Sequence, residues 1–438
     1  MLEVLIPALI ILIGLSLLKV PIYISVFCSA IYLQLFVNHM SLSSLFTGFF
    51  EAMTKNSLLA VPFFMVAGSI IAASSLGTRL INVCIELLKS VRGGLPIACV
   101  IANAIFGAIS GSGPATVAAL GIILIPAMIN RGGFSAPFAS SLMASASSIA
   151  IVIPPSIAFV VYASITGVSV GDMFMGGWIP GIMMGLSLVI IIMIECRKKG
   201  IQASKAKSSW GQRWKSFREA FWGFLMPVII IGGIYGGVFT PTEAAAVSVV
   251  YGLVVGVFIY REVKMKDMID ILVDSGKTTG GIMLIIGAAT LFSYVCTVFG
   301  IAQAAQALLL EISGNKYIFL LIVNVIFLIA GCFVDANSAM YIFIPIMYPV
   351  ATQLGIDPVH FGVIATVNLA IGQVTPPVGV NLFVAIGVSE KLRGLRDKTK
   401  VTIVSMSKAV WPQIVACIIA LLLITYVPWF STVLLFGK

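Results

Sequence analysis

The sequence predicts an all-α integral membrane protein made of two inverted repeats, each with a re-entrant hairpin and a broken helix. Its 438 residues are 60% hydrophobic and only 10% charged, whereas a soluble domain carries roughly 25% charged residues. Two proline pairs, Pro154-Pro155 and Pro376-Pro377, interrupt long apolar stretches, where each pair should break a membrane helix at mid-depth. Matching interruptions in two halves of a chain are typical of secondary transporters.

The prolines recur at a nearly constant offset, which indicates an internal repeat. Pro7 and Pro21 match Pro227 and Pro241 at an offset of 220 residues, and the proline pairs follow at 222. We therefore divide the chain into repeat one at 4–169, a linking helix and basic amphipathic connector at 170–223, repeat two at 224–389, and a basic loop with the last transmembrane helix at 391–438.

Each repeat contains two apolar halves on either side of a polar, helix-breaking tip. The tip is Ser110-Gly111-Ser112-Gly113-Pro114 in the first repeat and Val334-Asp335-Ala336-Asn337-Ser338 in the second. At roughly 1.5 Å per residue, each half is too short for a comfortable span of about 30 Å. We expect re-entrant hairpins at 95–130 and 317–352, followed by broken helices at 137–166 and 359–390.

The distribution of lysine and arginine tests this topology. With ten crossings, two hairpins and both termini outside, all but three of the 26 Lys and Arg residues lie on the cytoplasmic side; the exceptions are Lys55, Lys316 and Lys438. This is the positive-inside bias of proteins that span a lipid bilayer, so the net charge of +10 does not indicate nucleic-acid binding. The first hairpin then enters from the cytoplasm and the second from outside, which makes the repeats inverted.

Between the repeats we expect an apolar helix at 172–195 and then an amphipathic connector at 205–224. Trp210, Trp214 and Phe217 recur in the connector at helical spacing, with basic residues between them. Such a helix lies in the interface of the bilayer. We interpret it as an anchor, with the docking of a partner subunit as the alternative.

Asp335 is the one acidic residue placed deep in an apolar region. A carboxylate at that depth is costly unless it is paired or binds a cation, so a functional role is the default hypothesis. No Lys or Arg in the neighbouring segments is placed to pair with it, which leaves a bound cation as the natural partner. The alternative interpretation is a helix cap at the hairpin tip, and the two interpretations are compatible.

Sodium prefers several oxygen ligands, and broken helices supply backbone carbonyls for it. One predicted sodium site, at the second tip and the second break, comprises Asp335, Asn337, Gly372, Thr375 and Pro376. The other predicted site, at the first tip and the first break, comprises Ser110, Ser112, Ile151 and Pro154.

The same cavity should suit an anionic substrate, because half-helix N-termini direct their positive dipole ends into it. The candidate polar contacts to the substrate are Thr116, Ser147, Ser148, Gln373 and Asn381. A serine in a membrane helix often bonds to its own backbone instead, so each of these contacts has a structural alternative.

Two further acids are better explained by helix capping. The segment Thr240-Pro241-Thr242-Glu243 has Thr at the N-cap, Pro at the first helical position and Glu at the third, which is a capping box. Asp172 follows Gly171 and is best explained as the start of a helix.

Four ordered motifs resemble the large membrane subunit of tripartite ATP-independent periplasmic (TRAP) transporters. They are Ser-Gly-Ser-Gly-Pro-Ala-Thr at 110–116, Thr-Pro-Thr-Glu-Ala-Ala at 240–245, Phe-Val-Asp at 333–335 ahead of Ile-Pro-Ile at 344–346, and Thr-Pro-Pro at 375–377. The resemblance covers essentially the whole chain. It maps Ser112, Asp335 and Thr375 onto the sodium-site motifs of the family.

The resemblance implies sodium-driven uptake of an organic acid, such as sialic acid or a C4-dicarboxylate, by an elevator movement of the hairpins and broken helices against a scaffold. It also implies two partners, a small membrane subunit and a soluble periplasmic substrate-binding protein. Because repeat one begins at the N-terminus, the small subunit is expected as a separate chain. The implied location is the bacterial inner membrane, with both termini periplasmic. Na⁺ is the coupling ion, and no other cofactor is expected.

Other functions fit the sequence less well. A stand-alone sodium-coupled carboxylate transporter would share the inverted hairpins, but neither tip contains a Ser-Asn-Thr tripeptide. An intramembrane serine protease, prompted by the serines of the first tip, lacks a buried base because His39 and His360 fall at segment ends. The seven cysteines are scattered, so no transition-metal site is expected. No Walker A pattern occurs, so ATP does not drive transport directly, and no enzyme activity is expected.

Overall fold

The computed structural model describes residues 20–35, 42–201, 208–298, 300–397 and 399–435, with a few positions before Val20. Over these residues the regular structure is entirely helical, as the sequence predicts. The start of predicted repeat one, His39, the first connector residues and Lys438 lie outside the described residues.

The helices follow the predicted order. The first half of the chain contains α2 (Ile22–Leu33), α3 (Leu42–Met53), η2 (Asn56–Leu59), α4 (Ala60–Ala73), α5 (Leu76–Leu88), α6 (Gly94–Ser110), α7 (Gly113–Asn130), α8 (Ala136–Ser148), η3 (Ile149–Ile151), α9 (Ile157–Thr166) and α10 (Val170–Lys198). The second half contains α11 (Trp210–Tyr235), α12 (Pro241–Leu253), η4 (Val254–Ile259), α13 (Met265–Val298), α14 (Ile301–Ser313), α15 (Lys316–Phe333), α16 (Ala336–Gln353), α17 (Pro358–Gly372), α18 (Val380–Lys391), α19 (Ile403–Tyr426) and α20 (Trp429–Thr432).

The hairpins and broken helices begin at matching positions in the two halves. Helices α6, α7, α8 and α9 start at residues 94, 113, 136 and 157, and α15, α16, α17 and α18 start at 316, 336, 358 and 380. Each start in the second half therefore lies 222 or 223 residues after its counterpart. This spacing is the one that two repeats would produce, while their inverted orientation stays a prediction.

Seven described helices are long and apolar enough to cross a membrane, namely α7, α10, α11, α12 with η4, α13, α15 and α19. An eighth span results if α4 and α5, bent by 69°, cross together. Two of the seven, α7 and α15, are hairpin arms of 18 residues each, so length alone does not separate a re-entrant arm from a crossing. The chain is a multi-pass membrane protein, and the count of ten crossings stays a prediction.

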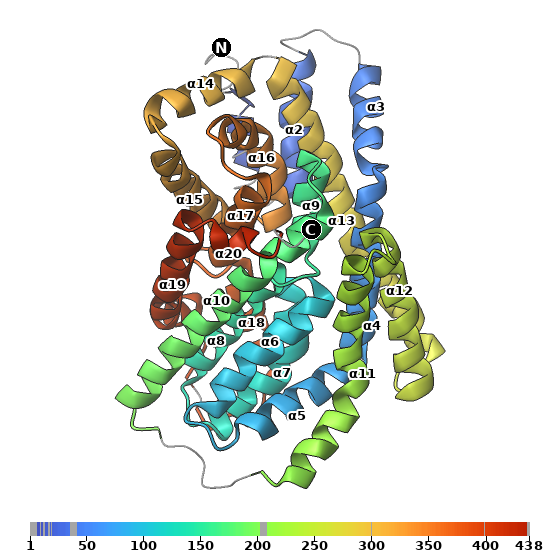
Figure 1. Cartoon of the computed structure of the whole chain (residues 1–438), viewed down its shortest axis with the longest axis vertical. Coiled ribbons are helices and arrows are strands. Elements are labelled where there is room, and N and C mark those ends of the chain that lie inside the picture. Colours follow the sequence, from blue (N-terminus) through green and yellow to red (C-terminus); the bar gives the residue numbers. More distant parts are fainter. Residues whose placement is uncertain are drawn as a thin grey trace.

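The helices form two groups that lie side by side in Figure 1. An outer layer consists of α2, α3, α4, α11, α12 and α13, in which α12 packs on α4 and α13 packs on α2, α3 and α4. A central bundle consists of α6 to α10 and α15 to α19, with each hairpin against a broken helix. Helix α5 contacts both groups, because it packs on α11 and on α6.

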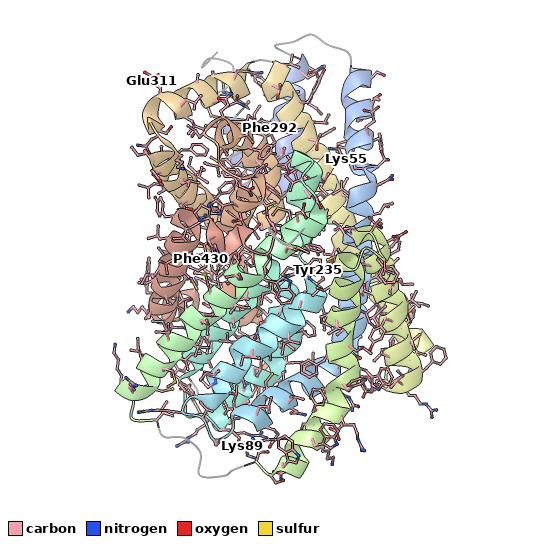
Figure 2. All side chains as sticks on the ribbon, in the orientation of Figure 1. Lys55, Lys89, Tyr235, Phe292, Glu311 and Phe430 are labelled. Atoms are coloured by element: carbon pink, nitrogen blue, oxygen red, sulfur yellow. The ribbon has the colours of Figure 1, made fainter. Side chains whose placement is uncertain are left out.

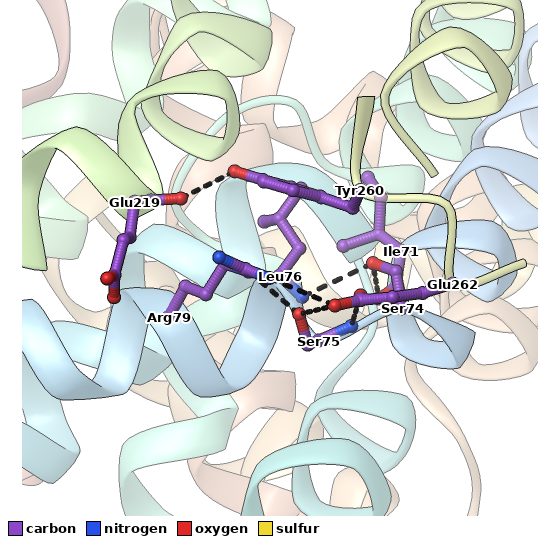
Figure 3. A network of polar contacts seen from close by, with 8 residues as sticks. All are labelled: Ile71, Ser74, Ser75, Leu76, Arg79, Glu219, Tyr260 and Glu262. Carbon is purple, nitrogen blue, oxygen red and sulfur yellow. Dashed lines mark hydrogen bonds and ion pairs between the residues drawn. The ribbon is translucent and has the colours of Figure 1, made fainter. Parts of the chain in front are cut away.

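The bend between α4 and α5 is held by one carboxylate from the outer layer (Figure 3). Glu262 accepts hydrogen bonds from the Ser75 backbone N–H at 2.7 Å, from the Ser75 hydroxyl at 2.6 Å and from Arg79 at 3.0 Å. The Arg79 guanidinium also lies 4.2 Å from the ring centroid of Tyr260. Burial alone would raise the pKa of Glu262, but the hydrogen bonds from Ser75 and the Arg79 charge outweigh it and hold the pKa below its usual range.

The central helices α8 and α17 are buried on every side. All residues of α17 from Val359 to Gly372 are buried, and so is all of α8 except Pro137. Small residues make this packing possible, since α8 reads APFASSLMASASS and small side chains let membrane helices approach closely. The two helices therefore hold their polar groups at fixed positions inside the protein.

Two features of the fold differ from or refine the sequence interpretation. The amphipathic connector is not a separate helix, because α11 runs without interruption from Trp210 into the following apolar span, with Pro227 inside it. Its aromatic side chains are exposed, Trp210 to 79%, as an interfacial helix requires. The Thr240–Glu243 capping box is confirmed, with both reciprocal hydrogen bonds present.

Candidate functional site

Both hairpins meet the broken helices through direct backbone contact. A methyl group added at Gly107 would lie 2.5 Å from the Cα of Ala150, and one added at Gly111 would lie 3.3 Å from the carbonyl oxygen of Pro155. The first hairpin thus packs on the first break. In the second half, a methyl group at Gly331 would lie 3.0 Å from the Cα of Gly372. The structure therefore brings each predicted tip beside its predicted break.

The first tip is closed by hydroxyl groups and contains no charge. Gly111 ends α6 in the left-handed region at φ 59°, a conformation that favours glycine. The Thr116 hydroxyl donates to the Ser112 carbonyl at 2.8 Å and lies 2.9 Å from the Ser110 hydroxyl. Ser112 is the N-cap of α7, but its side chain makes no capping hydrogen bond. Thr116, which we predicted to contact the substrate, lies at the tip together with the predicted sodium ligands Ser110 and Ser112.

Two amide side chains of the second broken helix face the first tip. A methyl group added at Gly113 would lie 2.8 Å from Gln373 Oε1 and 2.8 Å from Asn381 Nδ2. The structure holds the two amides together, because the Asn381 backbone N–H donates to the Gln373 carbonyl at 3.0 Å. Gln373 Oε1 and Asn381 Oδ1 are both buried and have no hydrogen-bond partner among the described residues.

A buried acceptor without a donor costs roughly 1–3 kcal/mol, so these two oxygens are suited to a ligand. Gln373 is 4% exposed and Asn381 is fully buried. A ligand could therefore reach these two side chains only from the side that faces the first tip. Both residues were predicted to contact the substrate, and the structure brings them together from the two ends of the second break. The contact partner Gly113 was not singled out from the sequence, because glycine carries no polar group to signal it.

The second tip contains the carboxylate. Asp335 is the N-cap of α16 and accepts hydrogen bonds from the backbone N–H groups of Asn337 and Ser338 at 3.1 Å each, and from the Ser338 hydroxyl. The capping interpretation is therefore confirmed. No Lys or Arg of the described part of the chain forms an ion pair with Asp335. Beside it, Asn337 Oδ1 is buried and has no hydrogen-bond partner in the described part of the chain, while its role as a ligand stays a prediction.

The second break lies against the end of α15, which leads into this tip. The Gly379 backbone N–H donates to the Cys332 carbonyl at 3.0 Å, and the Cys332 thiol lies beside Thr375. The Thr375 hydroxyl donates to the Ile371 carbonyl at 2.8 Å, and the Gly372 carbonyl accepts from the Thr375 backbone N–H. The oxygen of Thr375 keeps free lone pairs, whereas the predicted carbonyl of Gly372 already has one donor.

At the first break, one predicted carbonyl ligand already accepts a hydrogen bond from a side chain of the same segment. The Ser156 hydroxyl donates to the carbonyl of Ile151 at 2.5 Å and also caps α9, so one lone pair of this predicted ligand is in use. Pro154, the other predicted ligand of the first break, is buried beside it. The peptide bonds Pro154-Pro155 and Pro376-Pro377 are both cis.

Ser147 and Ser148 adopt the structural alternative, in which each hydroxyl bonds to the backbone of its own helix. The Ser147 hydroxyl donates to the Ala144 carbonyl at 2.7 Å, and the Ser148 hydroxyl donates to the Ser145 carbonyl at 2.8 Å. Both residues are fully buried. The structure thus gives these hydroxyl donors a partner in their own helix, while their oxygens can still accept a hydrogen bond.

A buried polar network outside the tips was not singled out from the sequence. Asn368 on α17 donates to Asn324 Oδ1 on α15 at 2.7 Å, and Asn324 donates to the Thr425 hydroxyl on α19 at 3.2 Å. His360 Nε2 lies 3.2 Å from the Thr425 carbonyl oxygen. The detectable signal was an asparagine in the middle of each of two apolar segments. The network joins three helices of the central bundle. The expectation that His360 is not buried was wrong, because it lies in the first turn of the buried helix α17 and is 2% exposed.

The chemistry that these groups share is oxygen coordination. The two tips and breaks present one carboxylate, amide oxygens, hydroxyls and backbone carbonyls, which are the ligands of hard cations. No group of three or more His, Cys, Asp or Glu residues able to hold a metal ion occurs within the described ranges. The oxygen set fits sodium, for which broken helices in transporters supply carbonyl ligands.

The chain matches one protein family over nearly its whole length. The family described as "Tripartite ATP-independent periplasmic transporter, DctM component" matches residues 9–430. The C4-dicarboxylate TRAP transporter large permease protein DctM of Rhodobacter capsulatus is 38% identical over 97% of each chain. The protein of the same name from Pseudomonas aeruginosa is 41% identical over 90% of each chain, and the sialic acid TRAP transporter large permease protein SiaM of Vibrio cholerae is 34% identical over 86% of each.

These relatives are named as transporter permeases, which are not enzymes, so the serine protease alternative is excluded. The solved structure of the YdaH transporter from Alcanivorax borkumensis superposes with a TM-score of 0.61 over 90% of this chain and 88% of that one, at 16% identity. At that identity the similarity concerns the fold alone, and it confirms the fold class of a helical membrane transporter.

Proposed function

The chain belongs to the DctM family of tripartite ATP-independent periplasmic transporters, and from this premise we propose that it is the large membrane subunit of a sodium-driven importer of C4-dicarboxylates. Relatives named for C4-dicarboxylates are 38% and 41% identical, and the one named for sialic acid is 34% identical. A permease named for isethionate is 40% identical over 86% of this chain, so identity alone does not rank the acids. The C4-dicarboxylate relatives match a larger share of the chain, 97% and 90%, which favours a C4-dicarboxylate, with sialic acid as the second candidate.

The observation that carries sodium coupling is the carboxylate of Asp335 at the second tip. It has no cationic partner among the described residues. The N-terminus of α16 and the groups that it caps stabilise its charge, but an acid within a membrane protein is by default a functional residue. The buried oxygen of Asn337 beside it also needs a partner. A bound cation would satisfy both groups, with Thr375 from the break completing the oxygen set.

An elevator movement of the central bundle against the outer layer would carry this site across the membrane. Three features support the proposal: the hairpins and broken helices pack on one another within the bundle, α5 contacts both helix groups, and α4 and α5 are sharply bent where they join. We place the protein in the bacterial inner membrane, with both termini periplasmic.

The proposed complex contains two partners, a separate small membrane subunit and a soluble periplasmic binding protein that delivers the acid. The exposed aromatic side chains of α11 would anchor the chain at the cytoplasmic interface.

Reconstitution tests the proposal. The chain and its small subunit are placed in proteoliposomes, the binding protein is added with radiolabelled succinate, and uptake is measured with an inward sodium gradient or with choline in place of sodium. We expect uptake only with all three proteins and with sodium. Uptake without sodium would overturn the coupling. A comparable rate from this chain alone would favour the stand-alone transporter, and uptake of sialic acid in place of succinate would change the substrate class.

A further inference from the structure

A cavity lies between the two helix groups, away from the hairpin tips. Its volume is about 280 Å³. The outer layer contributes Lys55, before η2, and the hydroxyls of Thr290 and Ser293 on α13, while the central bundle contributes Tyr341 and Tyr348 on α16. Pockets for drug-sized ligands begin at roughly 300 Å³. This cavity is slightly smaller, so it can hold an organic acid that is smaller than a drug molecule.

The cavity has one charged residue, and that residue is cationic. Lys55 Nζ donates to the Ser164 carbonyl at 3.1 Å, which uses one of the three donors of an ammonium group. No acid lines the cavity, and within the described ranges Lys55 forms no ion pair. Lys55 is exposed, and its ammonium keeps two donors that a ligand can use.

Hydroxyl groups line the same cavity. Tyr341 is 5% exposed, and its hydroxyl donates to the Ser164 hydroxyl at 2.9 Å, because the Ser164 proton is donated to the Val161 carbonyl at 2.7 Å. The donors left for a ligand are therefore Lys55 and the hydroxyls of Thr290, Ser293 and Tyr348. Thr290 and Ser293, one helical turn apart on α13, also line the cavity. A carboxylate accepts from ammonium and hydroxyl donors through two oxygens. The lining thus complements a carboxylate and repels a cation.

The position of the cavity gives the site a role. Lys55 is one of the few basic residues that charge bias places outside the cytoplasm, and in Figure 2 it lies in the opposite half of the molecule from Lys89, which belongs to a basic cytoplasmic cluster. We propose that this cavity is a first-contact site at which Lys55 and the surrounding hydroxyls hold one carboxylate of the substrate on the periplasmic side. The inference rests on the proposed uptake of organic acids.

Binding and uptake of succinate test the site in the complex with the small subunit. We expect Lys55→Met to weaken succinate binding, measured by equilibrium dialysis with radiolabelled succinate, by about tenfold, because it removes a charge-assisted hydrogen bond. Initial uptake at limiting succinate should fall by a similar factor and recover at saturating succinate. Lys55→Arg keeps the charge and should restore most of the binding.

Lys316→Met is the matched control, because it removes the same charge from the same predicted side at the start of α15, outside the cavity. It should leave both measurements unchanged. A purely structural Lys55, bonded to the last turn of α9, would lower the melting temperature in the methionine variant without changing binding, and that result overturns the site. Lys55-dependent binding without uptake would retain the site and refute the proposed function. Uptake that does not change when Lys55 is replaced would refute the site and support the proposed function. If the wild-type complex shows neither binding nor uptake, both proposals are refuted.

Discussion

The two hairpin tips share their position in the fold but differ in their chemistry. The first tip is neutral, is closed by the Ser110 and Thr116 hydroxyls, and lies against the amides of Gln373 and Asn381 from the other half of the chain. The second tip contains Asp335, which caps α16 by accepting hydrogen bonds from the backbone N–H groups two and three residues later. The first tip therefore depends on distant residues for its polar groups, whereas the second supplies its own charge. The same architecture thus places amides from the other half of the chain at one tip and a local carboxylate at the other.

Asp335→Asn should have the largest effect on uptake, because it removes the charge that distinguishes the second tip from the first. Losing a charged ligand should weaken sodium affinity by roughly 3 kcal/mol, or about 100-fold, so uptake should be nearly abolished. The asparagine can still cap α16, so expression and complex assembly should persist. Proteoliposome uptake under a sodium gradient is the measurement. Wild-type uptake by the variant would show that the second tip binds no cation.

Gly113→Ala should impair the first tip without any change of charge. Its methyl group would lie 2.8 Å from both Gln373 Oε1 and Asn381 Nδ2, and overpacking of this kind costs about 1–3 kcal/mol. We expect uptake to fall about tenfold. Gly387→Ala on α18 is the control, since nothing lies within 4 Å of its added methyl group. Equal losses in the two variants would refute the special role of the contact.

Removal of one hydroxyl from each tip compares them directly. Ser338→Ala removes a hydrogen bond to a carboxylate, and Thr116→Ala removes neutral ones. Because charge-assisted bonds are about twice as strong as neutral ones, the sodium concentration for half-maximal uptake should rise about fivefold in Ser338→Ala and about twofold in Thr116→Ala. Sodium titration of uptake measures both, and the reverse order would contradict the comparison.

The two tips should also change accessibility in opposite senses during transport. Single cysteines at Ala115, which is exposed, and at Val334, which is partly exposed, can be probed with membrane-impermeant thiol reagents after removal of the native cysteines. Sodium and succinate should increase labelling at one tip and decrease it at the other. Unchanged labelling at both positions would contradict a moving bundle.

Glu262 provides the contrast of a carboxylate that stabilises structure. Glu262→Gln should destabilise the α4–α5 bend by about 1–2 kcal/mol while changing uptake little at low temperature. Because the folded pKa is lowered, the contribution of the carboxylate is present above its unfolded pKa and is lost as the pH falls through the folded value. Melting temperatures of the variant and the wild type should therefore converge in acid. A constant difference would refute the ionic explanation.

Much of the fold was predictable because the local composition of a segment determines whether it can span a membrane. Helix pairs lie at 94–130 and 316–353, where we expected hairpins at 95–130 and 317–352, and each proline pair lies between two helices. That these pairs re-enter the membrane stays a prediction. Proline removes a backbone donor wherever it occurs, so its effect can be read without knowing the neighbours. The capping roles of Asp335 and Glu243 were predictable for the same reason, since a cap involves residues within one helical turn.

Tertiary structure alone decided which polar groups meet. Gln373 and Asn381 were predicted as separate contacts, but only the folded chain shows that Gly113, more than 250 residues earlier, lies against both. The Asn324–Asn368–Thr425 network and the cavity around Lys55 depend on packing between segments far apart in the sequence. The sequence by itself determined where the helices break, because that is a local property of the backbone. The fold decided what each break faces, because burial and hydrogen-bond partners depend on the other half of the chain.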